Sequence, residues 1–330
     1  MSLDKIIFDM QKVFGKGSVG AAIDIVQDKG HYSTGSLQLD AKLSGGFPKG
    51  LMTEIYGPEG SGKTTACLHA VADAQSKGDG AVYVDFEGSF DKIYAKSLGI
   101  DLKKLILIPP TNAEQGLQIA EKLCKSGEIG ILVVDSIATM LPIKQQQAEL
   151  GDANMALHAR LVSDFVKRFV PIMYTNNVAV VLVNQIREKP GVTFGSPEYS
   201  PGGNSIKFYA AVRLDIRKSG SVNKDKDGEV ISEPRKIKII KSKINSSTND
   251  TMMVDITYGE GFDRAGEIVD VGSELGLLEK SGSWYAYNNT KIAQGRESCK
   301  QFLKDNPELA KELEDKIIDK LFVKIISEDE

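Results

Sequence analysis

The segment LMTEIYGPEGSGKTT at residues 51–65 sets a short apolar strand before a glycine-rich loop and the start of a helix. Residues 57–64 follow the pattern G-x-x-x-x-G-K-[ST] of a phosphate-binding loop. The flanking sequence supplies the context that this motif requires, because 52–56 is typical of a strand and 64–74 of a helix. A glycine-rich turn with a surface lysine is the alternative. We therefore expect a site for a nucleoside triphosphate at this loop.

The chemistry of the loop explains why these residue types occur together. A helix N-terminus offers unpaired N–H groups and a positive dipole end to phosphates, and glycines let the backbone come close to them. Lys63 adds a mobile positive charge at the β and γ phosphates for binding and catalysis, and the Thr64 hydroxyl offers a hard oxygen to Mg²⁺. The residues expected to bind the nucleotide here are Gly57, Pro58, Glu59, Gly60, Ser61, Gly62, Lys63, Thr64 and Thr65.

Composition narrows the class of protein. At 330 residues, 41% of them hydrophobic and 26% charged, the chain can form one large core with small appendages. The net charge of −4 indicates no general affinity for nucleic acid, but the charge of the whole chain does not exclude a local basic groove. No apolar run approaches the ~18 residues of a membrane span, and the acid-containing N-terminus is unlike a signal peptide. Three scattered cysteines are typical of reduced thiols. We expect a cytoplasmic protein with no membrane partner.

Strand-like and helix-like segments alternate after the phosphate-binding loop. Strands are expected at 80–87, 105–108, 129–134 and 178–183, and helices at 90–97 and 112–125. This alternation predicts a mostly parallel sheet with helices on both faces. Three later strands, expected at 211–218, 235–243 and 252–258, extend the sheet antiparallel at one edge.

The chain is expected to divide into three parts. Residues 1–28 contain an amphipathic helix at 4–14, whose apolar face packs either on its own core or on a neighbouring subunit. Residues 29–263 form the nucleotide-binding core. Residues 264–330, which follow a Gly-Glu-Gly boundary, form a separate small α/β unit.

Polar residues at the carboxyl ends of the expected strands are candidates for catalysis, because ligands bind there in open α/β sheets. Asp135 ends a strand of four aliphatic residues and is expected to hold Mg²⁺ through water, unless it only caps the next helix. Glu87 ends another strand, where it can polarise the water that attacks the γ-phosphate or serve as a structural acid. Gln185 follows a further strand, within reach of the γ-phosphate.

Two segments carry the residue types that a nucleic acid needs. In the helix that begins at Met155, the residues Arg160, Ser163 and Lys167 share one face, which is either simply solvated or meets an anionic partner. The loop at 186–204 is long and lacks periodicity, so it is either functional or a disordered surface insertion. The cations and the aromatic residue that could bind single strands in this loop are Arg187, Lys189 and Phe194.

Several blocks of the sequence together resemble the bacterial RecA recombinase family. They span nearly the whole chain and are far more specific than a phosphate-binding loop alone. The blocks are STGSLQLD at 33–40, EIYGPEGSGKTT at 54–65, ILVVDS at 131–136, LVNQIR at 182–187, PGGNSIKFYAAVRLDIR at 201–217, YGEG at 258–261 and GSWYAYNNTKIAQGRE at 282–297. The resemblance implies an α/β fold with a RecA-like P-loop ATPase core, and it implies ATP and Mg²⁺ as cofactors.

The resemblance also implies roles around the nucleotide. Glu87 would be the catalytic glutamate, and Gln185 would sense the γ-phosphate and relay its presence to the loop that follows. Lys241 and Lys243 would reach the ATP of a neighbouring subunit, where a cation supplied in trans stabilises the transition state. The residues that would lie beside or near the adenine are Asp91, Tyr94, Tyr258 and Gly259.

On the DNA side, the resemblance implies that loops at 147–155 and 186–201 line a filament axis. Met155 would wedge between bases, and the first helix would dock on the adjacent subunit. The residues that would grip phosphates are Arg160, Ser163, Lys167, Gly202, Gly203 and Asn204. The implied partners are single-stranded and duplex DNA, further copies of the chain in a helical filament, and repressor and mediator proteins.

The chain departs from the family pattern in three places. Pro190 stands where the family usually has a long aliphatic residue against the DNA. Lys167 replaces an arginine and loses the bidentate geometry. The acidic tail is short, ending at 327–330, so we expect DNA entry to be less restrained.

The function predicted from sequence is a DNA-dependent ATPase that forms filaments and exchanges strands. Three alternatives stay open. A ring-forming or clock-type ATPase on the same core would lack the unit at 264–330. A small-molecule phosphotransferase would need an acceptor pocket and a lid, for which the sequence offers no residues. A scaffold that stimulates repressor self-cleavage can coexist with recombination.

Overall fold

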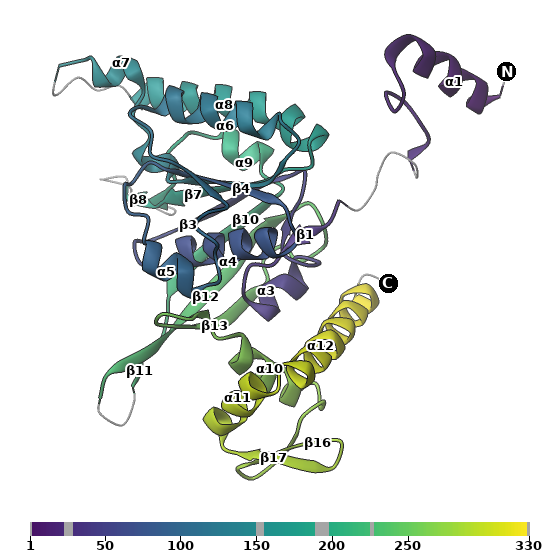
Figure 1. The fold of residues 1–330 in the computed structure, drawn as a ribbon, viewed down its shortest axis with the longest axis vertical. Helices are drawn as coiled ribbons and strands as arrows, with labels where there is room; N and C mark the ends of the chain where they lie inside the picture. Colours follow the sequence, from purple (N-terminus) through teal and green to yellow (C-terminus); the bar gives the residue numbers. More distant parts are fainter. Residues whose placement is uncertain (1, 23–28, 150–154, 189–197, 225–227, 329–330) are drawn as a thin grey trace. The chain divides into compact units, whose positions relative to one another are not determined.

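The computed structural model describes residues 2–22, 29–149, 155–188, 198–224 and 228–328 (Figure 1). The chain separates into two compact units, Met1–Gly30 and His31–Glu330. The predicted further division at residue 263 stays a prediction. Within the described residues, no helix is long and apolar enough to cross a membrane.

The first unit contains one helix, α1 (Leu3–Phe14). The Ser2 hydroxyl accepts a hydrogen bond from the backbone N–H of Lys5 and caps its start, and Gly15 follows its end. Its residues are half-buried or exposed, with Phe14 at 72% exposure. The helix therefore carries an apolar face that its own unit does not bury.

The second unit is built on one large sheet. In the described part of the chain its strand order is β14-β13-β12-β10-β3-β7-β6-β4-β5, with β11 paired to β12. The strands are β3 (Met52–Gly57), β4 (Gly80–Asp85), β5 (Leu105–Ile108), β6 (Ile129–Asp135), β7 (Ala179–Gln185), β10 (Val212–Lys218), β11 (Asn223–Lys224), β12 (Val230–Ser242), β13 (Thr251–Thr257) and β14 (Gly261–Phe262). Pairing is parallel from β10 through β3 to β5 and antiparallel from β10 to β14. The predicted parallel sheet with an antiparallel edge is confirmed. The expectation that the strand at 211–218 belongs to the antiparallel extension was wrong, because β10 pairs parallel with β3 and the antiparallel part begins with β12.

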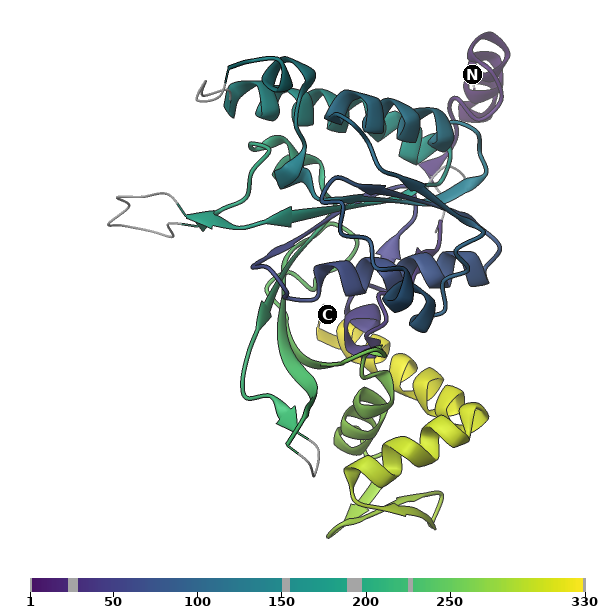
Figure 2. The ribbon, with the colours of Figure 1, turned by 60° about the vertical axis from the view of Figure 1, so that its left-hand side comes forward.

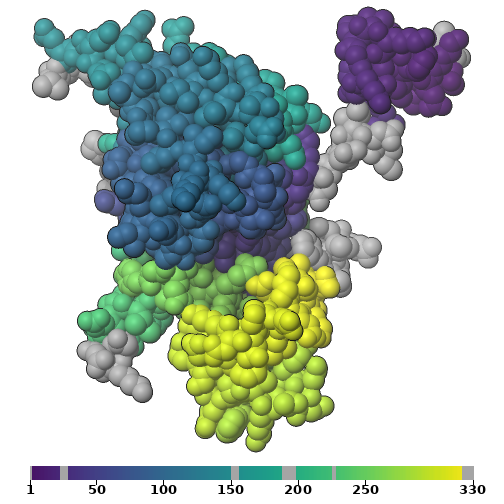
Figure 3. Space-filling model, in the orientation of Figure 1, coloured from purple at the N-terminus to yellow at the C-terminus, as the bar shows by residue number. Residues whose placement is uncertain are grey.

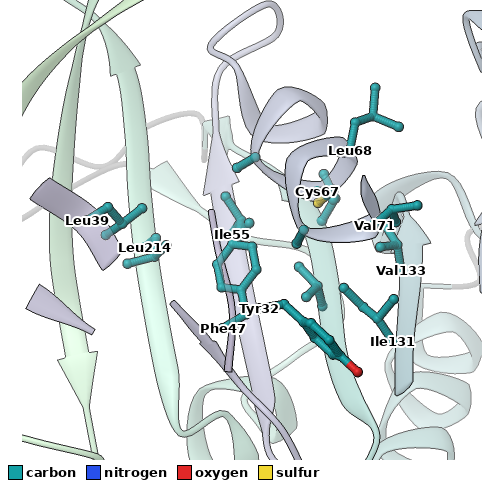
Figure 4. Packing of buried hydrophobic residues seen from close by; sticks show 14 of the residues in the cluster. Tyr32, Leu39, Phe47, Ile55, Cys67, Leu68, Val71, Ile131, Val133 and Leu214 are labelled. Carbon is teal, nitrogen blue, oxygen red and sulfur yellow. The ribbon is translucent and has the colours of Figure 1, made fainter. Parts of the chain in front are cut away.

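Helices cover both faces of the sheet (Figure 2). One layer holds α4 (Lys63–Ser76) and α5 (Lys92–Ser97), and the other holds α6 (Ala113–Cys124) and α8 (Met155–Thr175). Alternate side chains of β6 enter the two layers, because neighbouring residues of a strand point to opposite faces. Figure 4 shows Ile131 and Val133 packed beside Cys67 and Val71 of α4. A strand buried on both faces explains the unbroken aliphatic run before Asp135.

Short elements fill the connections. They are β1 (His31–Tyr32), α3 (Leu37–Lys42), β2 (Phe47–Pro48), a 3₁₀ turn (Ile137–Thr139), α7 (Ile143–Gln146), β8 (Arg187–Glu188), β9 (Glu198–Tyr199) and α9 (Ser205–Tyr209). Strands β8 and β9 pair antiparallel. The expectation of a loop without structure at 186–204 was therefore wrong at its base, where the two ends of the loop form a short hairpin stem.

The C-terminal segment forms a lobe with its own core (yellow in Figure 3). Its elements are α10 (Arg264–Glu274), β15 (Glu279–Ser281), β16 (Trp284–Tyr287), β17 (Thr290–Gln294), α11 (Arg296–Asp305) and α12 (Pro307–Glu328). Leu37 of α3 joins this apolar cluster. The Ser36 hydroxyl donates to Glu267 at 2.9 Å, and Arg264 pairs with Asp40 at 3.1 Å. The segment at 33–40 thus anchors the lobe to the core.

Candidate nucleotide site and DNA face

The phosphate-binding loop joins β3 to α4 and depends on glycine at a defined position. Gly62 precedes the first residue of α4 with φ near 99°. A Cβ at this position would lie 2.4 Å from Cδ1 of Ile256 in β13. The left-handed backbone favours glycine at this position, and the end of the Ile256 side chain would have to move to admit a Cβ.

Lys63 is buried at the start of α4 and points back to the loop. Its Nζ donates to the carbonyl oxygens of Gly57 at 3.0 Å and Pro58 at 2.7 Å. Burial lowers the pKa of Lys63, while the nearby carboxylates of Asp135 and Glu87 oppose that shift. The ammonium group therefore lies where β and γ phosphate oxygens could replace backbone carbonyls as acceptors.

Thr64 and Asp135 meet at the candidate metal position. The Thr64 hydroxyl donates to Oδ2 of Asp135 at 2.9 Å, and the Tyr83 hydroxyl donates to the same oxygen at 2.6 Å. Burial raises the pKa of Asp135, and the two hydrogen bonds oppose this rise. Among the described residues no group of three His, Cys, Asp or Glu side chains could hold a metal ion. Hydroxyl and carboxylate oxygens fit Mg²⁺, provided that phosphate and water oxygens complete its shell.

Glu87 and Gln185 touch each other at the carboxyl edge of the sheet. The side-chain amide of Gln185, at the end of β7, donates to Oε1 of Glu87 at 2.7 Å. Strand β8 begins two residues later at Arg187. The candidate general base thus contacts the residue that leads directly into the stem of the long loop.

A cavity of about 550 Å³ extends from the loop toward β13 and α5. The Asp91 carboxylate caps α5 by accepting from the backbone N–H groups of Ile93 and Tyr94. The Tyr94 and Thr65 hydroxyls are hydrogen-bonded at 3.0 Å. The four residues predicted for the adenine share the lining of this cavity with the phosphate-binding loop; they are Asp91, Tyr94, Tyr258 and Gly259. Their roles stay predictions.

Lys241 and Lys243 do not line this cavity. The Lys241 ammonium donates to the carbonyl oxygens of Lys207 at 2.6 Å and Phe208 at 3.1 Å, and that of Lys243 donates to Phe208 at 3.3 Å. Both lysines therefore lie beside α9 and away from the cavity of their own chain. Their role toward the ATP of a neighbouring subunit stays a prediction.

The structure brings part of the predicted DNA face together. On α8, Arg160 and Lys167 are exposed and Ser163 is half-buried. A Cβ on Gly203 would lie 3.5 Å from Ala159 of α8, so the segment at 202–204 packs against this helix. Arg187 is exposed on β8. Lys189, Pro190, Phe194 and the side chain of Met155 lie outside the described residues.

Comparison with known proteins agrees with this arrangement. The sequence model of the RecA N-terminal domain matches residues 1–263, and that of the RecA C-terminal domain matches 266–322. The chain belongs to the RecA family.

Among its relatives are curated proteins named Protein RecA. That of Rhodospirillum rubrum is 44% identical over 323 residues, 96% of this chain and 86% of the relative. That of Macrococcus caseolyticus is 44% identical over 318 residues, 96% of this chain and 89% of the relative. That of Brucella canis is 46% identical over 317 residues, 95% of this chain and 87% of the relative.

Three residues at the site of this RecA-family chain were not predicted from sequence: Asp85, Asn184 and Arg235. Asp85 accepts backbone N–H bonds from the four residues 87–90 and so shapes the turn that presents Glu87. The buried Asn184 amide donates to Glu54 at 3.1 Å and to the Pro201 carbonyl at 3.0 Å, which ties the returning end of the loop to the sheet.

The signals for these residues differ. An aspartate before Phe-Glu-Gly-Ser indicates a turn held by its own side chain, so Asp85 could have been found. The contact of Asn184 spans 17 residues and has no local pattern. The third residue is Arg235, which lines the nucleotide cavity from β12.

Proposed function

We propose that this chain is a DNA-dependent ATPase that forms helical filaments on single-stranded DNA. In this proposal it catalyses homologous pairing and strand exchange in recombinational repair. Membership of the RecA family supports a role in DNA recombination and repair. ATP and Mg²⁺ are the proposed cofactors, and single-stranded and duplex DNA are the proposed partners.

The single observation that carries the proposal is the hydrogen bond between Gln185 and Glu87. A γ-phosphate bound beside Lys63 would offer a stronger, charged acceptor to the Gln185 amide. Gln185 would then turn from Glu87 toward the phosphate, and the β8–β9 stem would follow because it is continuous with β7. Nucleotide state and the conformation of the DNA-binding loop are coupled in this way.

Hydrolysis follows from the same arrangement. Glu87, held by the turn around Asp85, takes a proton from the water that attacks the γ-phosphate. Lys63 and the loop N–H groups stabilise the charge that develops on the phosphate oxygens. Thr64 and, through water, Asp135 would hold Mg²⁺, which would supply positive charge to the phosphates when bound.

The filament supplies what one chain lacks. The exposed apolar face of α1 fits a neighbouring subunit, since its own unit does not bury that face. Lys241 and Lys243 would act on the ATP of an adjacent subunit, so hydrolysis depends on assembly. A filament of this kind can also serve as a platform for repressor self-cleavage.

The experiment measures ATP hydrolysis with and without single-stranded DNA for the wild type, Lys63→Ala and Glu87→Gln. We expect strong stimulation of the wild type by DNA. Lys63→Ala should neither bind nor hydrolyse ATP usefully. Glu87→Gln should bind ATP but hydrolyse it about a hundredfold or more slowly, since it keeps the shape and loses the base.

Lys77→Ala is the matched control. Lys77 follows the C-terminal end of α4, the end opposite to the phosphate-binding loop, and its Nζ lies 2.7 Å from Oδ2 of Asp73. It should behave as the wild type. Equal wild-type rates with and without DNA would contradict the proposal. So would a protein that stays monomeric and ignores oligonucleotides in the presence of a non-hydrolysable ATP analogue.

A further inference from the structure

Arg235 occupies a position on β12 that faces the protein core. Arg235, Ile237 and Ile239 alternate along this strand and are all buried. Arg235 is only 4% exposed. A buried guanidinium group costs free energy unless its donors are paired, so an arginine in an otherwise aliphatic row needs a reason.

The partners of Arg235 account for only part of its hydrogen-bonding capacity. One terminal nitrogen donates to Glu233 at 2.8 Å and to the Gly60 carbonyl at 3.4 Å, and the other donates to the Pro234 carbonyl at 3.2 Å. Among the described residues, its buried Nε has no hydrogen-bond partner. This nitrogen lies 3.9 Å from the position that a Cβ on Gly62 would take. The unpaired donor is therefore beside the phosphate-binding loop.

The location of Arg235 in the lining between two parts of the cavity suggests what its guanidinium group could meet. Gly60 and Gly62 belong to the phosphate end, while Tyr94 and Tyr258 line the part predicted for the base. Burial raises the pKa of Tyr94, and the charge of Arg235 opposes that rise, which is consistent with their closeness. In a nucleotide, the group between the outer phosphates and the base is the α-phosphate with its ribose.

We propose that Arg235 binds the α-phosphate of the nucleotide from within the same chain. The inference rests on the proposed nucleotide-binding function and adds to it a cation distinct from Lys63. Lys63 serves the β and γ phosphates, whereas Arg235 contacts a group that ATP and ADP share. Glu233 positions the guanidinium and also accepts from the Tyr258 hydroxyl at 2.7 Å, so one carboxylate orients both the arginine and the tyrosine.

This role makes a specific kinetic prediction. The α-phosphate does not react, so its contact with Arg235 is equally strong in the bound substrate and in the transition state. Removing such a contact weakens binding without slowing the chemical step. Losing a hydrogen bond to a charged group reduces affinity about tenfold or more.

The test compares Arg235→Gln, Arg235→Lys and Lys236→Gln with the wild type. ADP affinity is measured by displacement of a fluorescent ADP analogue, and KM and kcat for ATP are measured with single-stranded DNA. Arg235→Gln should weaken ADP binding and raise KM by about tenfold, with kcat changed less than about twofold. Arg235→Lys should fall between it and the wild type, since lysine keeps the charge but loses the fork geometry.

Lys236→Gln is the matched control, since it removes a charge from the next, exposed position of the same strand. Its ADP affinity should equal that of the wild type. Unchanged ADP affinity in Arg235→Gln would overturn the inference. A parallel fall in kcat with a lower melting temperature would also overturn it, because that result means a distorted loop.

If Arg235→Gln does not fold, Arg235→Lys decides between the same outcomes. If the wild type binds ADP but hydrolyses ATP at a rate independent of DNA, the proposed function is wrong. The ADP affinities of the Arg235 variants then still test whether Arg235 binds the α-phosphate.

Discussion

At the scale of single residues, the candidate nucleotide site combines positions chosen for their backbone conformation with positions whose side chains carry charge. Gly62 belongs to the first kind, because its backbone is left-handed and a methyl group there would displace the end of the Ile256 side chain. Lys63 and Arg235 belong to the second kind, and both are buried at the loop. The loop motif predicts Gly62 and Lys63. Arg235 contacts the loop at Gly60, from which it is separated by 175 residues of sequence, so the motif does not predict it.

We predict that Gly62→Ala weakens ADP binding at least about tenfold, because relief of the left-handed backbone strain shifts the loop itself, while the Ile256 side chain must also move aside. Gly78→Ala is the control. Gly78 also has a positive φ, near 83°, but a Cβ there meets nothing within 4 Å. It should lose about 1–2 kcal/mol of stability from strain and keep its ADP affinity. Titration of ADP and thermal melting measure the two effects, and equal ADP affinities of the two variants would contradict the argument.

At the scale of elements, the short β8–β9 stem continues from the edge of the sheet where Gln185 contacts Glu87. Arg217 of β10 forms a fork with Glu198 of β9, with donor–acceptor distances of 3.0 and 2.6 Å. Its Nε donates to Asp215 at 2.9 Å. Bidentate pairs fix geometry as well as adding free energy, so this fork aligns the stem with the central sheet.

We therefore expect Arg217→Gln to impair the response to DNA more than hydrolysis itself. The fork is partly exposed and worth roughly 1 kcal/mol, so stimulation by single-stranded DNA should fall about fivefold while the DNA-free rate stays near that of the wild type. Arg168→Gln removes another arginine–carboxylate pair, with Glu121, on the surface of α8. That variant should keep full stimulation. An Arg217→Gln protein with normal stimulation would show that the stem does not need this fork.

At the scale of the whole molecule, a buried polar junction fixes the C-terminal lobe to the core. Arg264 contacts Asp40 and Glu314, and Glu267 accepts from the Ser36 hydroxyl and the Gln38 backbone N–H. Burial raises the pKa of Glu267 to about 8, against these hydrogen bonds and the charge of Arg264, while Asp40 adds to the rise. The block STGSLQLD therefore serves the attachment of the lobe and lies outside the lining of the nucleotide cavity.

This junction predicts a pH dependence of stability. Folded Glu267 keeps its proton up to about pH 8, whereas in the unfolded chain it loses it near the ordinary value of 4.5. Folding binds a proton between these values, so the contribution of Glu267 to stability falls as pH rises from about 4.5 to about 8. In Glu267→Gln this contribution is absent, so the drop in melting temperature between pH 6 and pH 8.5 should shrink. Glu274→Gln, at an exposed position of the same helix, should retain the wild-type drop.

Much of the architecture could be predicted from the sequence because its signals are local. Four aliphatic residues before Asp135 indicate a strand buried on both faces, and β6 is one. The ends of strands were less predictable where the strand contains a residue type that disfavours it, such as proline. The strand expected from Arg235 begins at Val230, since pairing with β13 carries β12 past Pro234 to Ser232 and pairing with β11 extends it to Val230. The stem at Arg187 and Glu198 was missed because its two halves are too short to show any period.

By itself, the sequence determined the phosphate-binding loop, the alternation of strands and helices, and the family. Each of these depends on the order and spacing of residues that are neighbours in the sequence. Only the tertiary structure decided which residues meet. Thr64 contacts Asp135 across 71 residues, and Gln185 contacts Glu87 across 98. These contacts depend on the strand order of the sheet, which no local pattern contains. The physical reason is that strand pairing and burial over the whole core select this order, and the side chains at the strand ends follow from it.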